Sequence, residues 1–136
     1  MKIKNFAEQN GIEFVVLFGS QVKGSANENS DFDIAILKYS GQSFFSNLRE
    51  YYDVLSKLAE CLSIPSQKLD LVDLSHANIL LRRQITKGGK LIYGDSSLYE
   101  DYKSFAYRDF IDAKPLFDLE SEIINFRYDF LKRTLA

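Results

Sequence analysis

The hydrophobic pattern switches several times between a strand-like and a helix-like spacing. Runs rich in β-branched and aromatic residues, bounded by glycine or polar residues, predict strands. They cover residues 12–18, 31–38 and 68–74, and a shorter run covers 90–93. In the second run Asp31 and Asp33 are two positions apart. Both carboxylates therefore share one face of the predicted strand, and apolar residues point to the other face.

Other segments repeat their apolar residues every three to four positions, which predicts amphipathic helices. These helices are expected over residues 3–10, 43–62 and about 76–87, with Ser75 as the cap of the last one. From 97 to 134 the pattern predicts one or two further helices, with Pro115 marking the break. The expected fold class is α/β (α+β), with the strands early and helices at the end.

Composition narrows the function classes. The chain has 136 residues, of which 46% are hydrophobic and 26% are charged, as in an ordinary soluble globular domain. A net charge of −2 argues against a broad basic surface for nucleic acid. The sequence has no apolar signal region and no run that approaches a membrane span, so we expect a cytoplasmic protein without membrane contact.

The chain has one histidine, His76, and one cysteine, Cys61. A metal site built on several His and Cys side chains is therefore excluded. Any metal chemistry must use carboxylates, which favour hard cations such as Mg²⁺ or Mn²⁺.

Residues 18–33 combine types that suit phosphate and metal binding. The first predicted strand ends at Gly19-Ser20, where a short helix begins. Glycine lets the backbone approach phosphate oxygens closely, and free N–H groups at a helix start point at an anion. Lys23 is suited to touch a triphosphate, although an ordinary solvated lysine is equally expected there. Asp31 and Asp33 can clamp one or two divalent metals, which would bridge the protein and the triphosphate.

A third carboxylate is expected on an adjacent strand, and the run KLDLVDL offers two. Asp70 lies inside the strand, where a charge needs a reason to exist. Asp73 lies at the strand end before Ser75, where a turn or cap role suffices. We favour Asp70 as the third carboxylate, with Asp73 as the fallback. Asp70 would take the proton from an attacking hydroxyl and help to hold the metal.

The pattern Gly19-Ser20-x10-Asp31-x-Asp33, within LFGSQVKGSANENSDFDIAIL, resembles the polymerase-β-like nucleotidyltransferase superfamily. The resemblance is closer to its minimal nucleotidyltransferases, the MNT proteins, because KLDLVDL followed by a helix and GGKLIYGD also looks like that group. It covers about residues 11–95, and the helical segment over about 97–134 matches only loosely. It implies one nucleotidyltransferase domain over 1–136, a mixed sheet with helices on one face, and transfer of a nucleoside monophosphate from a nucleoside triphosphate.

The resemblance also implies a partner. Many MNT proteins are antitoxins that attach AMP to a tyrosine of a HEPN-type RNase toxin. By that resemblance Asp31, Asp33 and Asp70 are catalytic metal ligands, and Gly19-Ser20 contact the phosphates of ATP. The chain lacks the Arg-x4-His pattern of the toxin, so it would be the antitoxin half of a hetero-oligomer.

Two other functions stay open at this point. The chain would also be suited to neutralise a toxin by binding alone, or to modify a small molecule, as the aminoglycoside-type nucleotidyltransferases do. Eight tyrosines and eleven phenylalanines, many after residue 90, serve either the core or a docking surface.

Overall fold

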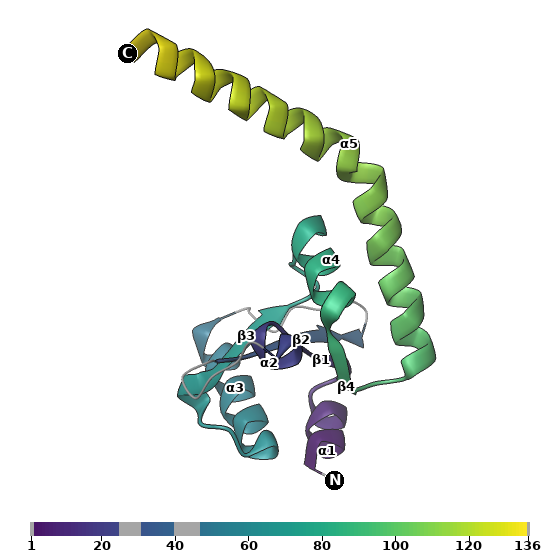
Figure 1. The fold of residues 1–136 in the computed structure, drawn as a ribbon. Coiled ribbons are helices and arrows are strands. Elements are labelled where there is room, and N and C mark those ends of the chain that lie inside the picture. The colour runs from purple at the N-terminus through teal and green to yellow at the C-terminus, as the bar shows by residue number, and fades with distance from the viewer. Residues whose placement is uncertain (1, 25–30, 40–46, 136) are drawn as a thin grey trace.

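The computed structural model describes residues 2–24, 31–39 and 47–135 (Figure 1). A four-stranded sheet has the order β3-β2-β1-β4. Its strands are β1 (Ile12–Phe18), β2 (Phe32–Lys38), β3 (Leu69–Asp73) and β4 (Lys90–Tyr93). β1 pairs antiparallel with β2 and with β4, whereas β2 and β3 are parallel. The mixed sheet and all four predicted strands are confirmed.

The helices are α1 (Lys2–Gln9), α2 (Ser20–Lys23), α3 (Leu48–Leu62), α4 (Ile79–Gly88) and α5 (Ser96–Leu135), with a 3-10 turn at Ser66–Lys68. The predicted start of α3, at residues 43–46, lies outside the described residues. Asn47 caps α3, and its side chain accepts a hydrogen bond of 2.8 Å from the Glu50 backbone N–H. The cap predicted for α4 was wrong. Asn78 caps it instead, by accepting from the Leu81 N–H at 2.8 Å.

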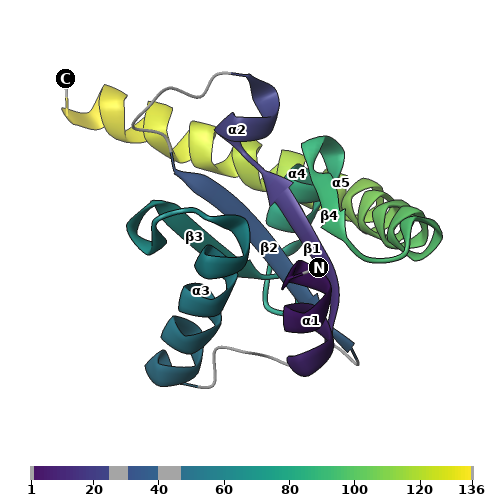
Figure 2. The same cartoon turned by 90° about the horizontal axis from the view of Figure 1, so that it is seen from below.

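Helices cover both faces of the sheet, so the implied arrangement on one face is wrong. Ile34 and Ile36 of β2 pack against α1 and α3, whereas Ala35, between them, packs in a second cluster with Ile85 of α4 and Tyr99 of α5. The full alternation of β2 between two apolar clusters requires a cover on each face. Figure 1 shows α1 and α3 on one side of the sheet and α4 on the other, and Figure 2 gives the same arrangement from below.

The C-terminal segment is one helix of 40 residues, and the break predicted at Pro115 is wrong. α5 continues through Pro115 and changes direction about midway along its length (Figure 1). A proline removes one N–H donor and its ring presses on the preceding turn, which bends a helix without ending it when the flanking residues favour helix. Among the described residues, no helix is both long and apolar enough to cross a membrane.

Candidate functional site

Gly19 and Asp33 touch where β1 ends and β2 begins. Gly19 follows the last residue of β1, with a φ of +81° and a ψ of −152°. A Cβ atom built on Gly19 would overlap Oδ2 of Asp33 and lie 3.2 Å from its Cγ. The positive φ favours glycine at this position, and a side chain here would have to displace the Asp33 carboxylate. The Asp33 carboxylate is thereby held against the backbone that opens α2.

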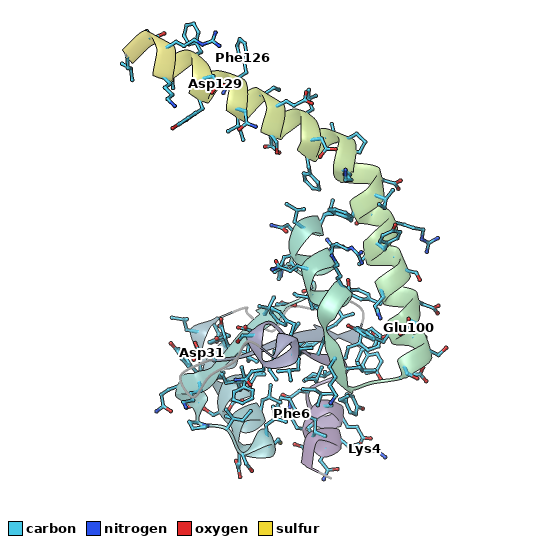
Figure 3. All side chains as sticks on the ribbon, viewed as in Figure 1. Lys4, Phe6, Asp31, Glu100, Phe126 and Asp129 are labelled. Carbon is cyan, nitrogen blue, oxygen red and sulfur yellow. The ribbon has the colours of Figure 1, made fainter. Side chains whose placement is uncertain are left out.

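The strand register brings Asp70 to the same place. Asp33 of β2 is the register partner of Phe18 in β1 on one side and of Asp70 in β3 on the other. Asp31 stands one residue before β2. Figure 3 shows Asp31 at the edge of the sheet, on the side remote from Glu100 at the start of α5. The three predicted carboxylates thus come from two adjacent strands and gather at one end of the sheet.

The electrostatic environment of Asp33 includes the charges of both neighbouring carboxylates. Burial raises the pKa of Asp33 above its ordinary value, and the negative charges of Asp70 and then Asp31 raise it further. Asp31 and Asp70 are exposed, whereas Asp33 is half-buried. Neighbouring carboxylates repel one another, so the site favours a bound positive charge.

The residue types at this end suit a divalent cation. Carboxylate oxygens are the ligands that Mg²⁺ and Mn²⁺ prefer, and the repulsion that raises the Asp33 pKa would become attraction to a cation. Over residues 2–24, 31–39 and 47–135, no three His, Cys, Asp or Glu side chains already converge as a complete ligand set. The fit therefore rests on the charge of the cluster and the contact of Asp33 with Gly19.

Ser20 opens α2, directly after Gly19. The turn is closed by the Val22 N–H, which donates to the Gly19 carbonyl at 3.2 Å. The space beside the Gly19 α-carbon is occupied by the Asp33 carboxylate, and Ser20, the next residue, is half-buried. A phosphate that approached this backbone would therefore come close to Asp33. The predicted phosphate contact of Lys23 concerns a side chain that lies outside the described part of the molecule.

Asp73 belongs to a different environment from Asp70, although the two are three residues apart. Asp73 is 2% exposed, and its Oδ1 accepts hydrogen bonds from the Ser75 N–H at 3.0 Å and from the Ser75 hydroxyl at 2.6 Å. Asp70 is exposed and lies in register with Asp33. Asp73 therefore holds the turn after β3, and its Oδ1 is already engaged.

One neighbour of the cluster escaped the sequence reasoning. Tyr51 lies on the side of α3 that packs against the core. Burial raises the pKa of the Tyr51 hydroxyl, and the negative charge of Asp70 is among the further causes. Helical spacing reports which face of α3 is buried but not which strand residue it meets, so it gave no sign of this proximity.

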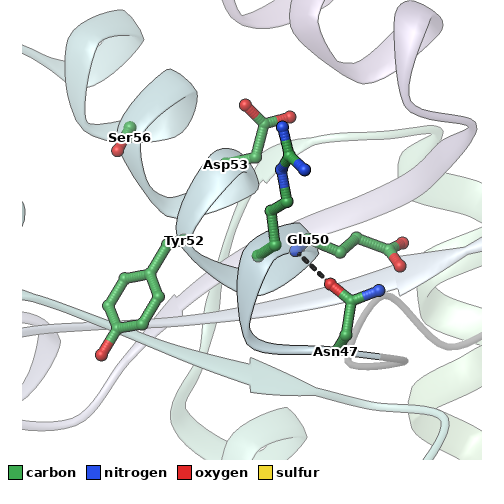
Figure 4. A pocket seen from close by; sticks show the side chains of 6 residues that line it. Asn47, Glu50, Tyr52, Asp53 and Ser56 are labelled. Carbon is green, nitrogen blue, oxygen red and sulfur yellow. Dashed lines mark hydrogen bonds between the residues drawn. The ribbon is translucent and has the colours of Figure 1, made fainter.

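A surface hollow of about 660 Å³ lies apart from the carboxylates. Its walls come from the first turns of α3 and its cap. Figure 4 shows them: Asn47, Arg49, Glu50, Tyr52, Asp53 and Ser56. None of the three clustered carboxylates lines it, and its polar groups of both signs offer no excess positive charge for a triphosphate. We therefore place no nucleotide there.

Comparisons with known proteins point to one family. The family model described as polymerase beta, nucleotidyltransferase, matches residues 1–98. The protein adenylyltransferase MntA of Aphanizomenon flos-aquae is 27% identical over 126 residues, which is 90% of this chain and 82% of the relative. The protein adenylyltransferase MntA of Shewanella oneidensis is 34% identical over 83 residues, which is 61% of this chain and 55% of the relative.

Solved structures share the fold. A crystal structure of a toxin–antitoxin with AMP-PNP matches with a TM-score of 0.60 at 24% identity, over 99% of this chain and 97% of that chain. A structure of tri-AMPylated Shewanella oneidensis HEPN toxin in complex with MNT antitoxin matches with a TM-score of 0.53 at 22% identity, over 99% of this chain and 94% of that one. At these identities the likeness establishes the fold alone.

Proposed function

The chain belongs to the polymerase beta nucleotidyltransferase family, and on this premise we propose that it transfers AMP from ATP to a hydroxyl of a HEPN-type RNase toxin, so that it acts as an antitoxin. The acceptor would be a tyrosine. Two relatives named protein adenylyltransferase MntA support the choice of reaction. The setting would be the cytoplasm, where ATP and the toxin are both present.

The observation that carries the proposal is the position of Asp33. This residue touches Gly19 just before the start of α2, and it is the register partner of Asp70 in the parallel pair of β2 and β3. A triphosphate laid on the Gly19-Ser20 backbone would therefore meet the carboxylates directly. Asp31 and Asp33 would hold a divalent cation, Mg²⁺ or Mn²⁺, with Asp70 as the third ligand. Such a cation neutralises charge on the reacting phosphate and on the leaving pyrophosphate.

The proposed reaction exchanges one bond at the α-phosphorus of ATP for another and moves one proton. The acceptor hydroxyl oxygen forms a bond to the α-phosphorus of ATP, while the bond from that phosphorus to the bridging oxygen of the β-phosphate breaks. Pyrophosphate leaves with the bonding electron pair. Asp70, exposed beside Asp33, would take the hydroxyl proton. Gly19 and Ser20 would position the phosphates with backbone N–H groups and the serine hydroxyl.

The test is a labelling assay with the purified chain, α-labelled ATP, Mg²⁺ and the HEPN-type protein encoded next to it. We expect label on that protein and release of pyrophosphate. The double variant Asp31→Asn/Asp33→Asn should lose the label, whereas Asp53→Asn, on the outer face of α3, should keep it. Asp53 is a suitable carboxylate control because it is exposed and pairs with the exposed Lys57 at 3.1 Å.

Three outcomes would overturn the proposal. Label that persists in the double variant would show that Asp31 and Asp33 are not needed for AMP transfer. An unlabelled toxin that is still silenced by the double variant would assign the neutralisation to binding alone. Transfer to an aminoglycoside-type antibiotic in place of the toxin would assign a small-molecule substrate.

A further inference from the structure

The second half of α5, residues 116–135, extends away from the rest of the molecule, and we refer to it as the projecting segment. The first half of α5 packs against α4, where Arg82 lies 3.7 Å from Asp109 and Arg83 covers the ring of Tyr107 at 4.7 Å. Figure 1 shows the helix leaving the body after this contact, and Figure 3 shows Phe126 and Asp129 far from the sheet and the other helices.

Two rows of large apolar side chains follow one side of the projecting segment. One row contains Leu116, Ile123 and Phe130, and the other contains Phe117, Ile124 and Leu131. Residues seven apart on an α-helix lie within about 20° of one another, so each row runs nearly straight along the helix. Five of the six are 45–69% exposed. An apolar face of this length is typical of a helix that is covered by another protein surface.

Two opposite charges interrupt this apolar side. Glu120 and Arg127 are also seven residues apart, and their positions fall between the two rows. Within the described part of the chain neither makes an ion pair, whereas Lys114 and Asp118, one turn earlier, are paired at 3.2 Å. A glutamate and an arginine inside an apolar face need opposite charges on the surface that covers them.

A second projecting segment that runs antiparallel to the first supplies these opposite charges. We propose that the projecting segment pairs with the same segment of a second copy, antiparallel, about a two-fold axis between Ile123 and Ile124. Glu120 then faces Arg127 of the partner subunit, and the symmetry repeats the pair on the other side of the axis. In the same register Leu116 faces Leu131 of the partner subunit. Self-complementarity of this kind is what a two-fold interface requires.

The alternatives fit the same residues less well. A parallel pair would place like charges together at both Glu120 and Arg127, which is unfavourable. An antiparallel pair also separates the two bodies, because each body packs against the first half of its own α5 and so lies at the opposite end of the pair. The carboxylate end of the sheet stays open in both copies, and the pairing is independent of the proposed transfer reaction.

The experiment is sedimentation velocity of the full chain without any partner, over low to tens of micromolar. We expect a dimer of the 15.6 kDa chain. Glu120→Arg and Arg127→Glu should each raise the dimer dissociation constant about tenfold or more, because each opposes like charges twice. An equimolar mixture of the two variants should regain the dimer, since every charge then faces its opposite. This regain also shows that both variants are folded.

The matched control is Glu122→Arg, on the opposite side of the same helix, which should leave the dimer intact. A wild-type chain that stays monomeric over this range would overturn the proposal. So would equal weakening by Glu122→Arg and Glu120→Arg, or a mixture of variants that remains monomeric. A monomer whose projecting segment becomes protected from proteolysis only when a HEPN-type protein is added would assign the face to that protein and not to a second copy.

Discussion

The Asp33 carboxylate rests against the α-carbon of Gly19, which lies between the end of β1 and the start of α2. The contact explains why this position has no side chain. It also joins the two parts of the proposed site, the turn proposed to bind phosphate and a carboxylate proposed to hold the metal. A change at Gly19 therefore tests the positioning of Asp33 without altering any carboxylate.

Gly19→Ala should reduce AMP transfer by about a hundredfold, because displacing a catalytic group by about 1 Å costs roughly that much. The added methyl group would overlap Oδ2 of Asp33. The alanine backbone would also have to keep a positive φ, which is unfavourable for a residue with a side chain. Steady-state labelling at saturating ATP measures the effect, and we expect it in kcat.

Gly11→Ala is the matched control. Gly11 also has a positive φ, +63°, but a Cβ there would meet nothing within 4 Å. The variant should lose about 1 kcal/mol of stability from backbone strain alone and keep full activity. If both alanine variants lost activity to the same extent, the contact between Gly19 and Asp33 would have no special role.

Much of the site could be predicted because its residues are neighbours in sequence. The strand ending in Gly19-Ser20 and the alternation of Asp31 and Asp33 are local patterns, and the structure places both at one sheet end. Asp70 was chosen because a charge inside a strand is unusual. Its register with Asp33 could not be derived, because the parallel pairing of β2 and β3 depends on how the chain between them, including α3, returns across the sheet.

The faces of the sheet and the end of the chain were harder to predict. Periodicity in β2 shows that alternate residues are buried, but it does not reveal that α4 and α5 cover the second face. Pro115 predicts a break from sequence alone, because proline disfavours helix interiors. The residues on both sides are good helix formers, and the helix absorbs the proline as a bend.

Asp70 and Asp73 should respond differently to the same substitution. Asp70→Ala should lower AMP transfer at least a hundredfold with little change in melting temperature, because the side chain is exposed and its proposed role is proton transfer. Asp73→Ala should lower the free energy of unfolding by about 1–3 kcal/mol, because the half-buried Ser75 N–H and hydroxyl lose their acceptor. Urea unfolding and labelling on both variants separate the roles, and an inactive but fully stable Asp73→Ala would make Asp73 the functional carboxylate.

The raised pKa of Asp33 predicts that Asp33→Asn stabilises the folded protein when no divalent cation is present. An acid whose pKa is raised by folding destabilises the folded state once it ionises, so the penalty is absent at pH below the ordinary value of 3.8 and fully present at neutral pH. Without divalent cation, Asp33→Asn should therefore melt at a higher temperature than the wild type at pH 7. The comparison is differential scanning calorimetry in a chelating buffer.

Adding Mg²⁺ or Mn²⁺ together with ATP should make the melting temperature of the wild type higher than that of Asp33→Asn. Ligands that bind only the folded state raise its stability by mass action. The melting temperature of the wild type should therefore rise, whereas that of Asp33→Asn should not. Asp53→Asn should gain as the wild type does. Equal gains in wild type and Asp33→Asn would show that Asp33 holds no cation.

Tyr99 is a buried aromatic residue whose hydroxyl has no hydrogen-bond partner in the described residues. It is 4% exposed and packs edge-on against Phe14 at 5.5 Å. Burial, followed by the charge of Glu100 and the influence of Tyr102, raises the pKa of Tyr99 to about 12. The surroundings of the phenol thus favour its neutral form.

Tyr99→Phe should raise the free energy of unfolding by about 1 kcal/mol at pH 7, because it removes an unpaired buried hydroxyl and keeps the ring contact. In the unfolded chain the phenol ionises from its ordinary value of 10, whereas the folded protein holds the proton to about 12. Wild-type stability should therefore fall as pH rises from 10 to 12, and more steeply than in the variant. Urea unfolding from pH 7 to 11.5 measures both effects. Tyr128→Phe, at a site 66% exposed, should change neither; an identical alkaline slope in wild type and Tyr99→Phe would mean that Tyr99 ionises as freely as a surface tyrosine.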